Sequence, residues 1–190
     1  MKQFRSLLAL TVLCAAPAIA HAQFGIKAGA SYGNVSNHGV LPGTVGQRSG
    51  VAAGVSIISG GFVGFGIEAL YAQRGITSTA AGDSRHLDYI DVPLYLRVAI
   101  PAPISPFVYA GPQGSYEIKC GTDGTDCPDT GRPKFTFAGV IGAGVRIPFL
   151  MGISVEGRYV YGLTDLKLST VSSSDSYQTR AFMVLAGISF

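Results

Sequence analysis

Apolar residues and small or polar residues alternate along most of the chain. Between Phe24 and Tyr32 every second residue is apolar, and Gly, Lys or Ser stands between them. A period of two is the pattern of a β-strand whose two faces meet different surroundings. The alternation covers the segments 24–32, 51–57, 63–72, 90–100, 108–117, 135–147, 153–163 and 182–190. The sequence therefore predicts an all-β fold with eight strands.

The connections between the predicted strands alternate in length. Short ones fall at 59–61, 101–105 and 148–152, and longer polar ones fall at 34–48, 75–86, 117–134 and 164–178. Short turns on one side and long loops on the other are typical of bacterial outer-membrane barrels, in which the short turns face the periplasm. An even number of strands brings both ends of the mature chain to that same side.

The two faces of the predicted strands differ in a way that indicates which one is outside. One face is apolar and carries no Lys, Arg, Asp or Glu at its central positions, as a bilayer requires. The other face is mostly Gly, Ala and Ser, which coats a soluble protein poorly but fits the narrow interior of an eight-stranded barrel. We therefore predict an antiparallel up-and-down transmembrane β-barrel. A soluble barrel with an apolar core is the alternative.

Charged residues of both signs share the predicted inner face. Because an unpaired charge in a confined site is costly, we predict an ion-pair and hydrogen-bond network inside the barrel. Its members are Lys27, Glu68, Asp91, Arg97, Arg146, Glu156 and Arg158, with Tyr95, Tyr109 and Gln113 nearby.

Aromatic residues on the outward face are expected to mark the two membrane interfaces. We expect Tyr32, Tyr71, Tyr116, Tyr159 and Tyr161 at the outer interface, and Phe24, Phe182 and Phe190 at the inner one.

Composition and charge support a membrane barrel. The 190 residues are 47% hydrophobic and only 13% charged, about half the usual share of charged residues in a soluble domain. After the N-terminal segment, no stretch reaches about 18 uninterrupted apolar residues, which disfavours a helical membrane protein. The net charge of +3 disfavours nucleic-acid binding, and we expect no nucleic-acid partner.

Residues 1–22 have the features of a secretory signal peptide. Lys2 and Arg5 give a basic start, an apolar segment follows, and Ala20-His21-Ala22 is an A-x-A cleavage site. An uncleaved membrane anchor is the alternative, but the apolar segment is short for one. We expect cleavage and export, which leaves 23–190 as one barrel domain in the outer membrane of a Gram-negative-type bacterium.

Two cysteines remain in the mature chain and flank a Gly- and Asp-rich stretch. Export implies an oxidising compartment, so we expect a short-loop disulfide between Cys120 and Cys127. Two cysteines are too few for a structural zinc site. Asp123, Asp126 and Asp129 lack the spacing of an EF-hand loop, which favours a solvated acidic loop over a Ca²⁺ site. We expect no metal and no cofactor.

Four segments of the chain resemble strands of the PorT-like family of outer-membrane β-barrels. They are IEALYAQRG at 67–75, HLDYIDVPLYLR at 86–97, PFVYAGP at 106–112 and EGRYVYGLTD at 156–165. They follow the family's order over nearly the whole mature chain, although Asp91 stands where the family commonly has Glu. Phe190 resembles the C-terminal aromatic residue that the barrel-assembly machinery recognises. The resemblance implies an OmpA-like small barrel among outer-membrane lipids, and it implies little about activity.

Motifs of catalysis do not appear in the structural context that they require. No G-x-S-x-G, H-E-x-x-H or P-loop segment occurs in a strand–helix context. Some small outer-membrane barrels modify lipids, which requires a nucleophile beside a base. The mature histidines, His38 and His86, fall in or beside predicted loops with no adjacent Ser, so solvated loop residues are the favoured interpretation. We expect no enzyme activity and no catalytic residue.

The function predicted from the sequence is structural or surface-binding. The barrel is expected to anchor a monomer, and the four outer loops are expected to contact an extracellular partner. The loop that carries Cys120 and Cys127 is the first candidate for recognition. A lipid-modifying enzyme and a narrow pore are the alternatives.

Overall fold

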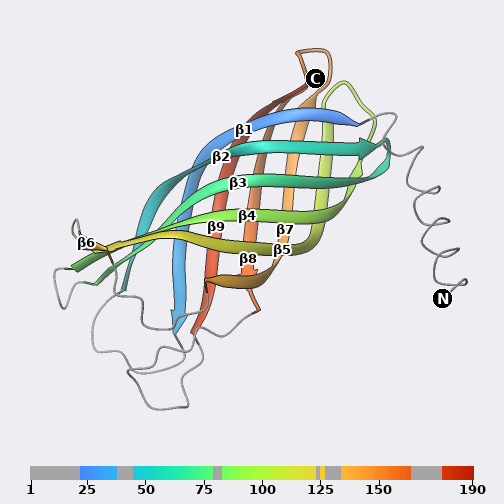
Figure 1. The fold of residues 1–190 in the computed structure, drawn as a ribbon. Coiled ribbons are helices and arrows are strands. Elements are labelled where there is room, and N and C mark those ends of the chain that lie inside the picture. Colours follow the sequence, from blue (N-terminus) through green and yellow to red (C-terminus); the bar gives the residue numbers. More distant parts are fainter. Residues whose placement is uncertain (1–21, 38–44, 79–82, 123–124, 127–133, 164–176) are drawn as a thin grey trace, which may run out of the picture.

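The structure of the chain, a computed structural model, describes residues 22–37, 45–78, 83–122, 125–126, 134–163 and 177–190, and this part of the chain is all-β (Figure 1). The strands are β1 (Gln23–Asn37), β2 (Val45–Gly60), β3 (Val63–Ser78), β4 (Asp83–Ala99), β5 (Ser105–Thr122), β6 (Thr125–Asp126), β7 (Phe135–Ile147), β8 (Ile153–Gly162) and β9 (Tyr177–Ser189). The described residues include no helix with the length and apolar character needed to cross a membrane.

Eight long strands of the described chain close into an antiparallel barrel. Each pairs with its sequence neighbour, and β1 also pairs with β9, so that Ala28 lies opposite Ala53 of β2 and Ala186 of β9. The predicted eight-stranded up-and-down barrel is therefore confirmed. Closure pairs the backbone groups around the wall, which the interior of a bilayer requires. The short strand β6 lies beside the barrel and pairs only with the last residues of β5.

The short turns and both ends of the barrel chain lie together at one end, the upper right of Figure 1. The turns occupy 61–62, 100–104 and 148–152. Gly60 and Gly152 have φ values of 101° and 59°, which glycine adopts without strain. The backbone N–H of Phe190 donates to the carbonyl oxygen of Phe24 at 2.7 Å, so the first and last strands end side by side. We call this the inner end, because short turns of such barrels face the periplasm.

The strands extend further toward the opposite, outer end than the sequence predicts. The predicted loops 34–48, 75–86 and 117–134 are too long, because β1 continues to Asn37, β3 pairs with β4 as far as Ser78 and Asp83, and β5 continues to Thr122. Alternation of polarity disappears where both faces of a strand meet water, whereas the backbone ladder continues. Of the predicted loop 164–178, residues 177–178 belong to β9 and the rest lies outside the described residues.

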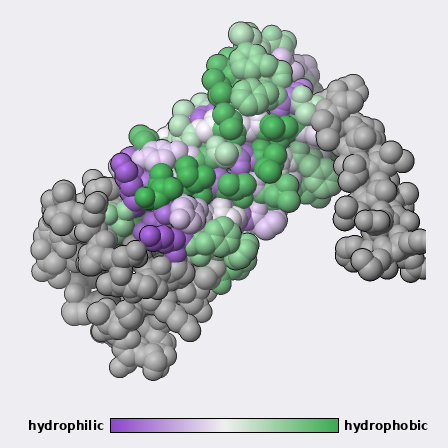
Figure 2. Space-filling view, viewed as in Figure 1, coloured by the Kyte–Doolittle hydropathy of each residue, from purple (hydrophilic) through white to green (hydrophobic). Residues whose placement is uncertain are grey.

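The wall of the barrel is apolar outside and filled inside. Every second residue of a strand faces outward and is exposed. The exposed fractions of Ile67, Leu94 and Val108 are 45%, 53% and 56%. Apolar side chains cover much of the visible wall in Figure 2. The expected aromatic positions hold with one exception. Phe182 pairs with Tyr32 and so lies at the outer interface, because β9 runs from the outer end to the inner end.

Candidate functional site

The centre of the barrel interior holds two acidic and two basic side chains in mutual contact. Lys27 comes from β1, Glu68 from β3, and Glu156 and Arg158 from β8. Lys27 Nζ lies 2.6 Å from Glu68 Oε1 and 2.8 Å from Glu156 Oε2. Arg158 Nη2 lies 2.6 Å from Glu68 Oε2 and also pairs with Glu156 Oε1. We call these four residues the central cluster.

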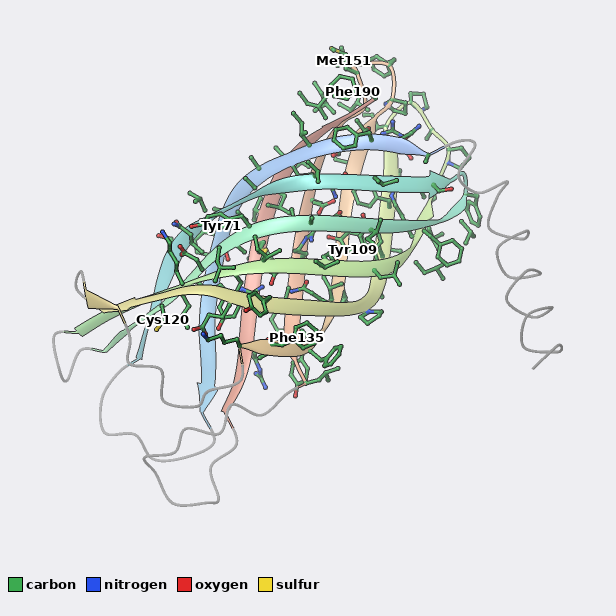
Figure 3. The ribbon with its side chains drawn as sticks, viewed as in Figure 1. Tyr71, Tyr109, Cys120, Phe135, Met151 and Phe190 are labelled. Atoms are coloured by element: carbon green, nitrogen blue, oxygen red, sulfur yellow. The ribbon has the colours of Figure 1, made fainter. Side chains whose placement is uncertain are left out.

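Two tyrosines from adjacent strands donate hydrogen bonds to the central cluster. The hydroxyl of Tyr95, on β4, donates to Glu68 Oε1 at 2.6 Å. The hydroxyl of Tyr109, on β5, donates to Glu156 Oε1 at 3.0 Å. Their ring centroids lie 4.5 Å apart, and Figure 3 shows Tyr109 on its strand. Each carboxylate of the cluster therefore accepts bonds from Lys27, from Arg158 and from one tyrosine.

Glycines on the neighbouring strands make room for these two rings. Gly66 is the register partner of Tyr95, and Gly142 is the register partner of Tyr109. A Cβ atom added at Gly66 would lie 2.3 Å from the ring of Tyr95, and one at Gly142 would lie 2.3 Å from the ring of Tyr109. Any larger residue at either position would displace a ring and with it a hydrogen bond to a carboxylate.

The central cluster is electrically neutral and almost dry. The side chains of Glu68 and Arg158 are 0% exposed, and that of Lys27 is 5% exposed. Charges at such a site are stable only when they are paired and their remaining polar atoms are hydrogen-bonded. Two positive and two negative charges cancel, so the loss of one member would leave a net charge in a dry interior.

An apolar layer and a second ion pair lie toward the outer end. Leu70, Val140 and Val160 are at most 2% exposed and close the interior above the central cluster. Asp91 lies opposite Leu70 in the pairing of β3 with β4, and it pairs with Arg74, which lies further toward the outer end of β3. The sequence analysis placed Asp91 in the network but missed Arg74, since the predicted strand ended at 72. Continuing its alternation by one step would have placed Arg74 on the inner face.

The remaining two residues of the predicted network lie toward the inner end. Arg97, on β4, is 7% exposed and stacks on the ring of Phe107, with its Cζ 4.3 Å from the ring centroid. Arg146 lies next to the end of β7. Within the described part of the chain neither guanidinium forms an ion pair. The structure thus brings four of the seven predicted residues together in the central cluster and pairs Asp91 with Arg74. Arg97 and Arg146 lie outside the central cluster.

Other predicted residues fall partly outside the described residues. Cys120 lies near the end of β5 and Cys127 is not described, so their disulfide stays a prediction. His38 is not described, and of His86 only the backbone position in β4 is. Phe190 is 65% exposed at the inner end, where Figure 3 labels it, and its role in assembly stays a prediction. Among the described residues no group of three or more His, Cys, Asp or Glu could hold a metal ion.

A closed barrel with an apolar exterior and a buried ionic interior defines an integral outer-membrane β-barrel protein. The sequence profile of the outer membrane protein beta-barrel domain family matches residues 15–168, and the chain belongs to this family. Its location is the bacterial outer membrane. No curated protein sequence matches the chain significantly.

Solved outer-membrane barrels share the fold at low sequence identity. Neisserial surface protein A is 12% identical over 88% of this chain and 97% of its own, with a TM-score of 0.55. OprG from Pseudomonas aeruginosa is 10% identical over 90% of this chain and 96% of its own, with a TM-score of 0.53. Ail, the attachment invasion locus protein of Yersinia pestis, is 16% identical over 90% of this chain and 99% of its own, with a TM-score of 0.51. These likenesses concern the fold.

The interior of the barrel is densely filled, and the acids of the central cluster are paired. Arg158, Leu70, Met183, Leu185 and Gln113 are each less than 2% exposed, so side chains fill the barrel at mid-height. The carboxylates of the central cluster are saturated by neighbouring cations and hydroxyls. Such groups hold strands together across the lumen but offer no free base to a substrate.

Proposed function

We propose that the chain is a membrane-anchored surface protein that binds an extracellular partner through the outer ends of β3–β6. The observation that carries this proposal is the filled interior. Because the central cluster and the apolar layer of Leu70, Val140 and Val160 occupy the lumen, the barrel is a poor conduit for solutes. The parts of a filled barrel that remain available to a partner are its ends.

The outer end is raised on one side of the barrel. The strands β3, β4 and β5 have 16, 17 and 18 residues, whereas β8 has 10. The ladder of β3 and β4 continues to Ser78 and Asp83, and β5 pairs with β6 through Gly121 and Thr122. We call residues 73–78, 83–89, 117–122 and 125–126 the outer sheet, which lies at the left of Figure 1.

The outer sheet rises well above the aromatic girdle. Six residues of strand at about 3.3 Å each, tilted by about 40°, climb roughly 15 Å. Ile118 is 44% exposed and Lys119 is exposed beside it, so the sheet offers both apolar and charged contacts. A rigid, hydrogen-bonded sheet loses less conformational entropy on binding than an isolated loop does. The predicted disulfide would stiffen the sheet further.

Ail, which shares this fold, is an example of such a barrel with a bound ligand. Ail was solved in complex with the heparin analogue sucrose octasulfate. That ligand is a property of Ail, and for this chain the class of partner is left to experiment. The finer resemblance to PorT-like barrels, carried by the four strand motifs, likewise belongs to this proposal and concerns kinship rather than a role in secretion. That the chain is not an enzyme also stays a prediction.

Photo-crosslinking on intact cells tests the proposal. A photoreactive amino acid is placed at Ile118 in the outer sheet and, as a matched control, at Val108, which is 56% exposed on the wall. We expect a discrete macromolecular adduct at position 118 and only lipid adducts at position 108. Deleting 120–127 should abolish the adduct at 118 without loss of the folded barrel. Lipid adducts alone at both positions, or an adduct that survives the deletion unchanged, would contradict the proposal.

A further inference from the structure

A small cavity opens at the inner end, between the central cluster and the short turns. Its volume is about 20 Å³, enough for about one water-sized group at a time. Three hydroxyl side chains line it, those of Ser56, Ser154 and Ser189. Its charged lining consists of Lys27 and Glu156 from the central cluster and, toward the periplasm, of Arg97 and Arg146.

The Nε–H groups of both arginines lack a hydrogen-bond acceptor, as do those of Arg74, Arg158 and Arg180 among the described residues. Arg97 is 93% buried, and its Nε has no hydrogen-bond acceptor. The Nε of Arg146 is buried without an acceptor as well. Stacking on Phe107 covers one face of the Arg97 guanidinium. Both arginines line the same cavity.

The acids of the interior are already matched by other cations. Glu68 and Glu156 are neutralised by Lys27 and Arg158, and Asp91 pairs with Arg74. Lys27 and Glu156 pair with each other, so the cavity carries two further positive charges that form no ion pair with a described carboxylate. Two like charges in a confined site are costly unless an anion lies between them.

We propose that Arg97 and Arg146 form a binding site for a phosphate group at the periplasmic mouth of the barrel. Guanidinium edges match the paired oxygens of such a group, and the hydroxyls of Ser56 and Ser154 can donate further hydrogen bonds. The cavity is too small for a whole metabolite, so one or two phosphate oxygens enter while the rest of the ligand stays in the mouth. The phosphate is either free in the periplasm or carried by a phospholipid headgroup of the inner leaflet.

Resonances of the arginine Nε–H groups test the site directly. The full barrel, labelled with ¹⁵N-arginine, is folded into uncharged maltoside micelles without phosphate and titrated with inorganic phosphate. We expect saturable shifts at Arg97 and Arg146 and none at Arg180, which stacks on Tyr161 toward the outer end. Short-chain phosphatidylglycerol forms the second arm. If the shifts saturate at a lower concentration of the lipid than of inorganic phosphate, the natural ligand is a phospholipid headgroup. If they saturate at a lower concentration of inorganic phosphate, the natural ligand is free phosphate.

Variants separate a built site from general attraction of anions. Arg146→Gln should raise the half-saturating concentration about tenfold or more, as expected for loss of a charged hydrogen-bond donor. Arg180→Gln should leave it unchanged, although both variants lose one charge. Arg146 is the less buried of the two site residues, so its variant keeps the test open if Arg97→Gln does not fold. Parallel, unsaturable shifts of all three arginines, no shift with either ligand, or unchanged binding in Arg146→Gln would overturn the proposal.

Discussion

Neutralising one acid of the central cluster should destabilise the barrel strongly. Glu68→Gln keeps the shape of the side chain but removes one of two negative charges, while Lys27 and Arg158 keep their positive ones. Glu68 accepts bonds from Lys27 at 2.6 Å, from Tyr95 at 2.6 Å and from Arg158 at 2.6 Å. The variant leaves an uncompensated positive charge in a dry interior, which costs about 3–5 kcal/mol in the free energy of unfolding.

A second substitution tests whether charge balance is the cause. Lys27→Met alone leaves the cluster negative and should also destabilise the barrel, whereas Glu68→Gln combined with Lys27→Met restores neutrality. We expect the double variant to lose about 2–3 kcal/mol less than the sum of the two single losses.

Urea unfolding in lipid vesicles gives the free energies of unfolding of the parent, the two single variants and the double variant. Far-ultraviolet circular dichroism follows the unfolding, because the chain has no Trp. Lys119→Gln, an exposed loss of charge, should stay within about 0.5 kcal/mol of the parent. A Glu68→Gln variant equally close to the parent, or strictly additive losses, would refute the argument.

Three further outcomes follow from the same geometry. Leu94→Arg should lower the free energy of unfolding by about 2–4 kcal/mol, because position 94 faces the hydrocarbon. Ile118→Arg, in the outer sheet, should lower it by about 1 kcal/mol or less. Equal losses for the two variants would contradict the placement of the wall. Gly142→Ala should lower the free energy of unfolding by about 1–3 kcal/mol, because the new Cβ displaces the ring of Tyr109. Gly157→Ala should lower it by less than about 0.5 kcal/mol, because the nearest neighbour of its Cβ would lie 3.6 Å away. Chemical unfolding of both variants measures the two losses, and a larger loss for Gly157→Ala would contradict the packing. Planar-bilayer recordings of the purified barrel should show no stable channel, and discrete, reproducible conductance steps would favour the pore alternative.

The sequence predicts the barrel well, because each strand of the wall has one face toward lipid and one toward the interior. This arrangement produces the period of two in the sequence. Each strand crosses from one end to the other with one face in hydrocarbon, so residues such as Ile67 and Glu68 report opposite faces from their order alone. Closure then follows from the apolar exterior, which leaves no place for an unpaired strand edge. The strand ends are harder to predict, because the alternation of apolar and polar residues fades toward the outer ends of β3 and β4 while their backbone pairing continues to Ser78 and Asp83.

The pairing of the inner charges cannot be predicted from their parity. Parity assigns Glu68 and Arg97 to the interior, but their heights depend on strand tilt and register, which the sequence does not specify. The structure places Glu68 beside Lys27 and Arg158, from strands 41 and 90 residues away in sequence. The bulge between Asp88 and Tyr89 likewise shifts the register of β4 against β5 without a signal in the local sequence.

The barrel has an apolar wall in contact with lipid chains around a polar, filled interior. Methyl resonances of a ¹³C-labelled barrel in bilayer nanodiscs, recorded with a nitroxide attached to the lipid tails, measure this contact for individual side chains. We expect strong broadening for the wall residues Ile67, Leu94 and Val108 and little for the buried residues Leu70 and Leu185. Broadening of Leu70 and Leu185 as strong as that of the wall, or wall methyls that respond instead to a water-soluble relaxation agent, would contradict this arrangement.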